Sequence, residues 1–309
     1  MQVWLNGEVV SESEAQVSVF DSGIQHAVGL FETMSAHNAR IFRVMEHAER
    51  LVESSRTLLM SQRLQAGPLA EAAERLLAQN TMTEARIRLT VTGGNLNMLQ
   101  AAEGGHVDPT VLIVIQPPTN YPPVFFSQGV EVCLAAGREN PWTPMAGHKT
   151  LNYWPRIHAL QMAGLAGASE ALWLDPAAHL MSGCVSNLFI IRDGCLQTPW
   201  ARGEQSESGE TSPVLPGITR GAVIECAEAA GITVQRMNLT LDDLLQADEA
   251  FLTNSSWQVL PVRGLRLQRR QEDGTPGVES RPIGAGSVGS MTTQLRRDLL
   301  DLIERETHD

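Results

Sequence analysis

The sequence contains 23 lysine and arginine residues, and only Lys149 is a lysine. A lysine amine can lose its proton when desolvated and attack a carbonyl carbon, whereas arginine stays protonated in proteins. A codon bias toward arginine explains the scarcity of lysine. It does not explain why the remaining one lies between a Pro/Gly-rich segment and the Asn152-Tyr153 pair. We therefore expect Lys149 to be a nucleophile that forms a Schiff base with a carbonyl compound.

Other segments offer groups that bind anions. Gly217-Ile218-Thr219 begins a predicted helix, and the backbone N–H groups there lie at the positive end of the helix dipole. Ser255 and Ser256 follow a predicted strand and add two hydroxyls. Every helix has such an N-terminus, so this pattern alone is a weak sign of a phosphate site. Arg50 lies off the apolar stripe of a helix predicted from Met45, where most arginines are simply solvated.

The composition argues against several classes of function. The net charge of −12 disfavours sequence-independent nucleic-acid binding, which needs a basic surface. The four cysteines show no CxxC spacing, so we expect free thiols in a reducing compartment and no metal site. The N-terminus lacks a signal-peptide pattern, and no apolar run is long enough for a membrane span. We expect a cytoplasmic protein without a membrane or nucleic-acid partner.

Hydrophobic patterns predict both helices and strands. Residues 86–92 alternate strictly and predict a half-buried strand, and the apolar run 110–115 predicts a second. Residues 287–306 predict a closing amphipathic helix. The polar segment 201–212 is interpreted as a mobile surface insertion, with a lid as the alternative.

A proline-rich segment divides the chain. Four prolines within residues 117–123 favour extended backbone and cannot build a helix. Residues 117–126 are therefore predicted to be a linker between a small domain, residues 1–116, and a larger domain, residues 127–309.

The order of these signals resembles the class IV aminotransferases, the fold type IV family of enzymes that use pyridoxal 5′-phosphate (PLP). That family comprises branched-chain aminotransferases, D-amino-acid aminotransferases and aminodeoxychorismate lyases. The resemblance covers nearly the whole chain. It rests on motifs that are weak singly but specific together: Trp4-Leu5-Asn6-Gly7, Asp21-Ser22-Gly23, Gly29-Leu30-Phe31-Glu32, Glu46-His47-Ala48-Glu49-Arg50-Leu51, Lys149-Thr150-Leu151-Asn152, Ser186-Asn187-Leu188-Phe189, Leu215-Pro216-Gly217-Ile218-Thr219-Arg220 and Phe251–Val262.

The resemblance implies a two-domain α+β/α/β fold, with a small N-terminal α+β domain and a larger, β-barrel-like domain that binds PLP. Lys149 would be the Schiff-base lysine, and Tyr153 would bind the ring hydroxyl of PLP. The residues implied to complete the cofactor site are Arg50, Gly217, Ile218, Thr219, Ser255 and Ser256 at the phosphate, with Ser182 and Asn187 elsewhere on the cofactor.

Two departures from the family pattern bear on the reaction. The glutamate that faces the pyridine nitrogen in the family aligns with Ser182, and neither Asp nor Glu occurs between Pro176 and Ile191. The arginine and histidine that trap the substrate carboxylate in the D-amino-acid branch are missing from residues 94–98. The candidate substrate-binding residues, His26, Phe31, Asn97 and Trp257, do not identify the substrate.

We expect an enzyme that transfers an amino group between an amino acid or amine and a 2-oxo acid. A PLP-dependent lyase performing β-elimination and a catalytically impaired relative are the alternatives, because a serine cannot hold the pyridine nitrogen protonated as a carboxylate does. The family also implies a homodimer in which a loop near residues 95–100 completes the partner's site.

Overall fold

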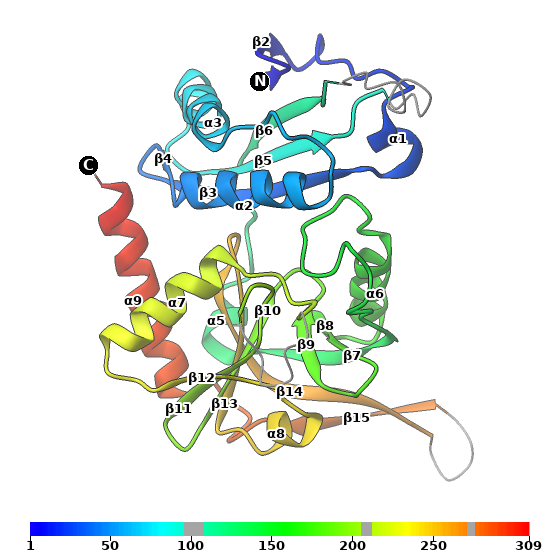
Figure 1. Cartoon of the computed structure of the whole chain (residues 1–309). Coiled ribbons are helices and arrows are strands. Elements are labelled where there is room, and N and C mark those ends of the chain that lie inside the picture. Colours follow the sequence, from blue (N-terminus) through cyan, green and yellow to red (C-terminus); the bar gives the residue numbers. More distant parts are fainter. Residues whose placement is uncertain (96–107, 205–211, 271–275, 309) are drawn as a thin grey trace. The chain divides into compact units, whose positions relative to one another are not determined.

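The structure is a computed structural model that describes residues 1–95, 108–204, 212–270 and 276–308 of the chain. The chain forms two compact units (Figure 1). The first unit comprises Met1–Thr119, His148–Tyr153 and Ile303–Asp309, and the second comprises Asn120–Gly147 and Trp154–Leu302.

The first division between the units falls at Thr119 and Asn120, within the segment predicted to be a linker. The last residues of that segment enter a short helix, α5 (Val124–Gln128). The sequence prediction placed residues 148–153 in the larger domain. In the structure they belong to the first unit, because they pair with its sheet through the Leu30–Thr150 bridge.

The first unit is built on a six-stranded antiparallel sheet. Asn6 and Gly7 both have positive φ and turn the first hairpin, as their sequence predicts. In sheet order the strands are β2 (Glu8–Ser11), β1 (Gln2–Leu5), β6 (Val111–Gln116), β5 (Ala85–Thr92), β3 (Gly29–His37) and β4 (Arg40–Ile41).

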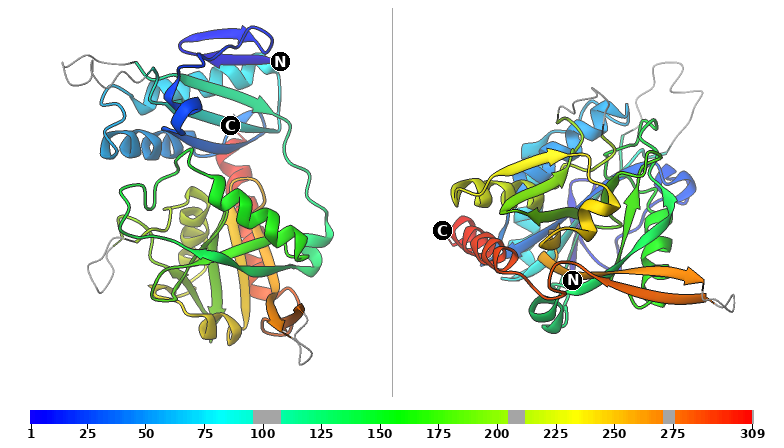
Figure 2. Two further views of the ribbon diagram at one scale, coloured as in Figure 1. Left: turned by 90° about the vertical axis from the view of Figure 1, so that its right-hand side faces the viewer. Right: turned by 90° about the horizontal axis from the view of Figure 1, so that it is seen from below.

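Helices α2 (Val44–Thr57) and α3 (Ala66–Asn80) cover one face of this sheet, and α1 (Ser22–His26) precedes β3 (Figures 1 and 2). Strand β5 alternates as predicted: Ile87, Leu89 and Val91 are buried in the core with the apolar stripes of the two helices. The intervening residues of β5 lie on the other face of the sheet.

The second unit is built on a nine-stranded mixed sheet. Its order is β12 (Val234–Met237), β11 (Cys195–Pro199), β10 (Asn187–Arg192), β13 (Glu249–Asn254), β14 (Gln258–Arg270), β7 (Val130–Arg138), β8 (Glu170–Leu174) and β9 (Leu180–Gly183), with β15 (Pro276–Pro282) paired to β14. Strand β9 also pairs with β10 through Ser182 and Asn187, so the strands from β10 to β9 close into a ring. This ring is the barrel implied by the family resemblance.

A bulge at Met181 determines which way Ser182 faces. Leu174 pairs with Leu180 and Trp173 pairs with Ser182, so one extra residue is accommodated in β9. Leu174 and Leu180 are buried in the apolar core of the ring. The side chains of the neighbouring pair, Trp173 and Ser182, therefore lie on the opposite face of the sheet.

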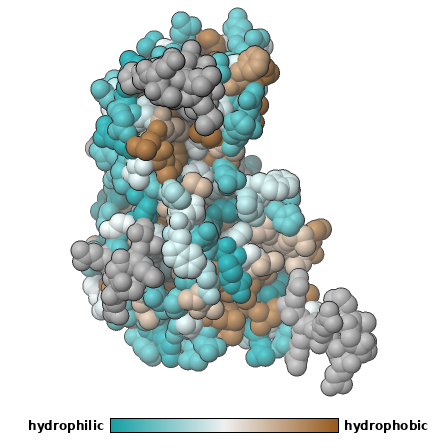
Figure 3. Space-filling view, turned by 45° about the vertical axis from the view of Figure 1, so that its right-hand side comes forward, coloured by the Kyte–Doolittle hydropathy of each residue, from teal (hydrophilic) through white to brown (hydrophobic). Residues whose placement is uncertain are grey.

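Further helices complete the second unit: α6 (Trp154–Leu165), α7 (Ile218–Ala229), α8 (Leu241–Leu245) and α9 (Ser290–Thr307), whose last residues belong to the first unit. Among the described residues, none of these helices is long and apolar enough to cross a membrane. The face in Figure 3 is largely hydrophilic, with separate hydrophobic areas.

Candidate active site

Lys149 is held against the sheet of the first unit by backbone hydrogen bonds. The Phe31 amide donates to the Lys149 carbonyl at 3.0 Å, and the Leu151 amide donates to the Gly29 carbonyl at 2.9 Å. A Cβ at Gly29 would lie 2.6 Å from Leu151 Cδ1 and 2.7 Å from the Val91 carbonyl oxygen. Glycine is therefore required for the lysine segment to approach β3 this closely.

The side chain of Lys149 lies in an aromatic and cationic environment. Its Nζ is 4.3 Å from the ring centroid of Phe31 and 5.5 Å from that of Tyr153. These two rings meet edge to face at 5.2 Å. The guanidinium carbon of Arg88 lies 3.6 Å from the Phe31 centroid. One aromatic ring thus contacts two cations, which it can attract through its π face.

Arg50 belongs to a buried charged cluster beneath this site. Its Nε donates to Glu32 Oε1 at 2.8 Å and its Nη2 donates to Glu32 Oε2 at 2.5 Å. Burial opposes ionisation of Glu32, but the charge of Arg50 and the contact with His47 outweigh it and lower the pKa of the carboxyl to about 2. Arg50 is therefore fixed in place by a carboxylate, with part of its charge already neutralised.

His47 is the third member of this cluster. Burial lowers the pKa of its imidazole, the contact with Glu32 opposes this, and the charges of Arg50 and Lys149 lower it further. A neutral His47 faces an ionised Glu32, which can only accept, so Nδ1 donates to Glu32 Oε2 at 2.8 Å.

In the second unit, α7 begins with groups suited to an anion. Gly217 is its N-cap, no side chain caps it, and its first turn contains no acidic residue. A Cβ on Gly217 would lie 2.1 Å from Asn187 Oδ1, so the helix N-terminus packs directly on Asn187. Asn187 Nδ2 in turn donates to the Leu215 carbonyl at 2.9 Å. Thr219, in this first turn, is buried.

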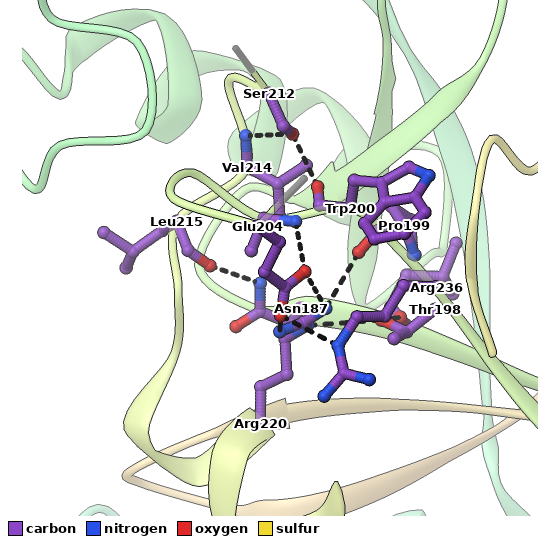
Figure 4. A network of polar contacts seen from close by, with 12 residues as sticks. Asn187, Thr198, Pro199, Trp200, Glu204, Ser212, Val214, Leu215, Arg220 and Arg236 are labelled. Carbon is purple, nitrogen blue, oxygen red and sulfur yellow. Dashed lines mark hydrogen bonds and ion pairs between the residues drawn. The ribbon is translucent and has the colours of Figure 1, made fainter. Parts of the chain in front are cut away.

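Arg220, in the first turn of α7, forms an ion pair with Glu204 (Figure 4). Arg220 donates to both carboxylate oxygens of Glu204, at 2.8 and 2.9 Å, and Arg236 donates to the same carboxylate at 3.0 Å. Burial alone would raise the pKa of Glu204, but the contacts with the two arginines outweigh burial and lower the pKa. The described ends of the segment predicted to be mobile, Ala201–Glu204 and Ser212, thus hold defined contacts, and residues 205–211 lie outside the described residues.

A row of polar residues crosses the strands beside α7. Ser182 pairs with Asn187, and Asn187 pairs with Thr253, so the three side chains share one face of the sheet. The turn after this row contains Ser255 and Ser256. Its Asn254 side chain accepts from the backbone amides of Ser256 and Trp257, at 2.9 and 3.0 Å. The Ser256 amide is thereby occupied, and the turn offers the Ser255 and Ser256 hydroxyls.

The other predicted substrate residues lie in different surroundings. His26 is exposed at the end of α1, whereas Trp257 is buried in the apolar core of the second unit, 5.6 Å from Tyr121. Asn97 lies outside the described residues. Their assignment to the substrate stays a prediction.

Two arginines near these groups were missed by the sequence reasoning. Arg88 alternates with core residues along β5, a pattern that looks like an ordinary solvated face. Arg156 lies in the first turn of α6 and donates to Ser182 Oγ at 3.3 Å. Only its position three residues after Tyr153 could have drawn attention to it.

Comparison with known proteins identifies the family. The sequence matches the family described as amino-transferase class IV over residues 29–265, and the chain belongs to this family of PLP-dependent aminotransferases. A putative branched-chain-amino-acid aminotransferase of Methanocaldococcus jannaschii is 31% identical over 304 residues, which cover 98% of this chain and 96% of that protein.

Solved structures of similar proteins support the same family assignment. The crystal structure of Escherichia coli branched-chain amino acid aminotransferase matches with a TM-score of 0.84 and 27% identity, covering 100% of this chain and 96% of that one. The 4-amino-4-deoxychorismate lyase of Pseudomonas aeruginosa matches with a TM-score of 0.79 and 26% identity, covering 97% and 98%. The family, the two-domain fold and the PLP-dependent aminotransferase class expected from the sequence are confirmed.

Proposed function

We propose that this enzyme transfers an amino group between an amino acid and a 2-oxo acid, with Lys149 as the residue that binds PLP covalently. The observation that carries the proposal is the placement of the only lysine in the sequence, fixed on β3 with its amine over Phe31. PLP, when bound, supplies an electron sink for negative charge at the substrate Cα. Lys149 would remove the Cα proton and return it, as general base and acid.

Each unit contains donors of the kind that the phosphate and ring of PLP require. Arg50 would supply a guanidinium, and the uncapped N-terminus of α7 would supply backbone N–H groups together with Thr219. The turn after β13 would add hydroxyls from Ser255 and Ser256. Tyr153 would bind the ring hydroxyl, and Ser182 and Asn187 would contact the cofactor from the second unit.

Arg88 is proposed to bind a carboxylate of the substrate. It stacks on the same ring as Lys149, and among the described residues it forms no ion pair. Burial lowers the pKa of its guanidinium to about 10, which leaves it protonated near neutral pH. A half-buried cation beside the reactive amine matches the charge of an amino acid or 2-oxo acid.

Borohydride trapping tests the covalent step. Reduction should attach the cofactor to the peptide that contains Lys149, and Lys149→Arg should abolish the adduct while the protein stays folded. Arg88→Gln should raise KM for a carboxylate substrate and leave the adduct intact. A reducible adduct in the Lys149→Arg protein would overturn the assignment.

A β-elimination lyase is the second candidate, and Ser182 is the observation that favours it. A neutral hydroxyl provides no charge to keep the pyridine nitrogen protonated, whereas a good leaving group on the substrate relieves the negative charge itself. Incubation with a panel of amino donors separates the two reactions. Conversion of bound PLP to pyridoxamine phosphate supports transamination, and pyruvate release without conversion supports elimination.

We also propose a homodimer, in keeping with the resemblance to the family. The segment expected to reach the partner, near residues 95–100, lies almost entirely outside the described residues. Sedimentation of the PLP-bound protein at micromolar concentration should give twice the chain mass, and the monomer mass would contradict the proposal.

A further inference from the structure

The Ser182 hydroxyl is held by a cation. Arg156 Nη1 donates to Ser182 Oγ at 3.3 Å and to the carbonyls of Gly183 and Cys184 at 2.9 and 3.4 Å. Its Nη2 donates to Glu139 Oε2 at 2.8 Å, and its guanidinium lies 5.7 Å from the Trp173 ring centroid. These contacts fix Arg156 at the turn between β9 and β10.

The direction of the hydrogen bond between Arg156 and Ser182 determines whether the Ser182 hydroxyl can donate to a ligand. A guanidinium has no acceptor, so Ser182 Oγ must accept from Arg156 and keep its own hydrogen for another partner. Among the described residues, that hydrogen has no acceptor, although Ser182 is only 5% exposed. A buried hydroxyl of this kind is suited to a ligand atom that accepts a hydrogen bond.

The same hydroxyl faces the proposed cofactor groups of the second unit. Ser182 pairs with Asn187, so their side chains share one face, and Asn187 contacts the N-terminus of α7. The bulge at Met181 places Ser182 on this face rather than in the apolar core. Ser182 and the anion-binding end of α7 therefore lie on the same side of the barrel wall.

We propose that Arg156 is a positioning residue that makes Ser182 a hydrogen-bond donor to an unprotonated pyridine nitrogen of PLP. This inference rests on the proposed function, because it requires PLP at Lys149. Hydrogen bonding to the neutral form of a base stabilises that form, and a nearby cation disfavours a second positive charge. Glu139 binds Nη2 of Arg156 and Ser182 contacts Nη1, so the group next to Ser182 is the guanidinium and not a carboxylate.

The carboxyl group of Glu170 is occupied by the turn after Ser182. It is fully buried, and its oxygens accept from the backbone amides of Ala171, Cys184 and Val185 and from the Ser186 hydroxyl. Burial raises the pKa of its carboxyl, and these hydrogen bonds only partly oppose the shift. Its role is to hold the turn after Ser182.

Nitrogen NMR of holoenzyme reconstituted with PLP labelled in the ring nitrogen tests the proposal directly. The native protein should show an unprotonated nitrogen near neutral pH. Ser182→Ala should raise the pKa of that nitrogen, because a bond to the neutral form is lost. If Ser182 instead accepted from a protonated nitrogen, the same change would lower the pKa, so the sign of the shift decides between the two arrangements.

Arg156 variants separate positioning from a purely structural role. Arg156→Gln should raise the pKa of the ring nitrogen by about one to three units, the usual effect of changing a nearby charge. Arg156→Lys should preserve the native signal. Arg138→Gln, which changes an exposed arginine of β7, is the matched control and should have no effect.

The outcomes are distinguishable. A protonated nitrogen in the native holoenzyme, with PLP trapped on Lys149, overturns this inference and leaves the proposed function intact. An unchanged ring-nitrogen signal in the Arg156→Gln protein would likewise overturn the inference and leave the proposed function intact. Failure to trap PLP on Lys149 overturns both. Should Arg156→Gln not fold, the sign of the Ser182→Ala shift still decides.

Discussion

The two units differ in the chemical groups of their proposed site residues. In the first unit, charged groups gather around Phe31 and Glu32, where Lys149, Arg50 and Arg88 are all partly or fully buried. In the second unit, the groups proposed for a ligand are hydroxyls, an amide and backbone N–H groups. Its nearby arginines, Arg156 and Arg220, each bind a glutamate. We therefore propose that charge binding and proton transfer depend on the first unit, whereas the groups of the second unit orient the ligand by hydrogen bonds.

The largest effect is expected where the charged cluster loses its carboxylate. Glu32→Gln leaves Arg50 and His47 buried without their anionic partner, and it should destabilise the protein by ~3–5 kcal/mol. Urea unfolding measures this, with Glu84→Gln, at an exposed carboxylate paired with His37, as the surface comparison. An equal effect of the two changes would show that the cluster is not stabilising.

The same cluster predicts a dependence of stability on pH. The folded pKa of Glu32, about 2, lies below its ordinary value of 4.5, so its stabilisation is present above pH 4.5 and is lost as pH falls toward 2. The unfolding free energy of the native protein should fall through this window. Glu32→Gln should show a smaller fall there, and identical pH profiles would contradict the assignment.

A smaller effect is expected on cofactor affinity. Arg50→Ala should weaken PLP binding by about 1.5–3 kcal/mol, the scale of a charge-assisted hydrogen bond. Arg56→Ala, at an exposed position of the same helix, is the control. PLP retention during dialysis measures both, and unchanged retention in Arg50→Ala would show that the phosphate lies elsewhere.

In the second unit, a glycine substitution at the N-terminus of α7 tests whether that helix end binds the phosphate. Gly217→Ala places a methyl group against Asn187 and should displace the N-terminus of α7, weakening PLP binding by about 1 kcal/mol, the net value of one hydrogen bond. Gly221→Ala lies in open space on the same helix and should not weaken it. If Gly217→Ala and Gly221→Ala bind PLP with equal affinity, the N-terminus of α7 does not bind the phosphate.

Local patterns predicted much of this molecule. The alternation in β5 and the closing helix α9 follow from residue type and spacing, because each depends on neighbours in the sequence. The reactivity of Lys149 stays a prediction from its residue type and its neighbours. The unit to which Lys149 belongs depends on its pairing with β3, more than a hundred residues earlier, and no local pattern reports that pairing. The bulge at Met181 and the reach of Arg156 to Ser182 likewise depend on strand register and tertiary packing.

The composition of the first unit from three separate stretches of chain has a consequence for how the protein is made. Residues 1–119 can begin to fold early in synthesis, but the strand-like segment of Lys149 reaches β3 only after residue 153 has been added. The contacts from Asn38 and Arg43 to Thr307 and Glu306 form later still. Such long-range contacts slow folding. The nascent chain therefore gains the Lys149 segment of the first unit midway through translation, and the first unit is complete only when the last turn of α9 has been synthesised.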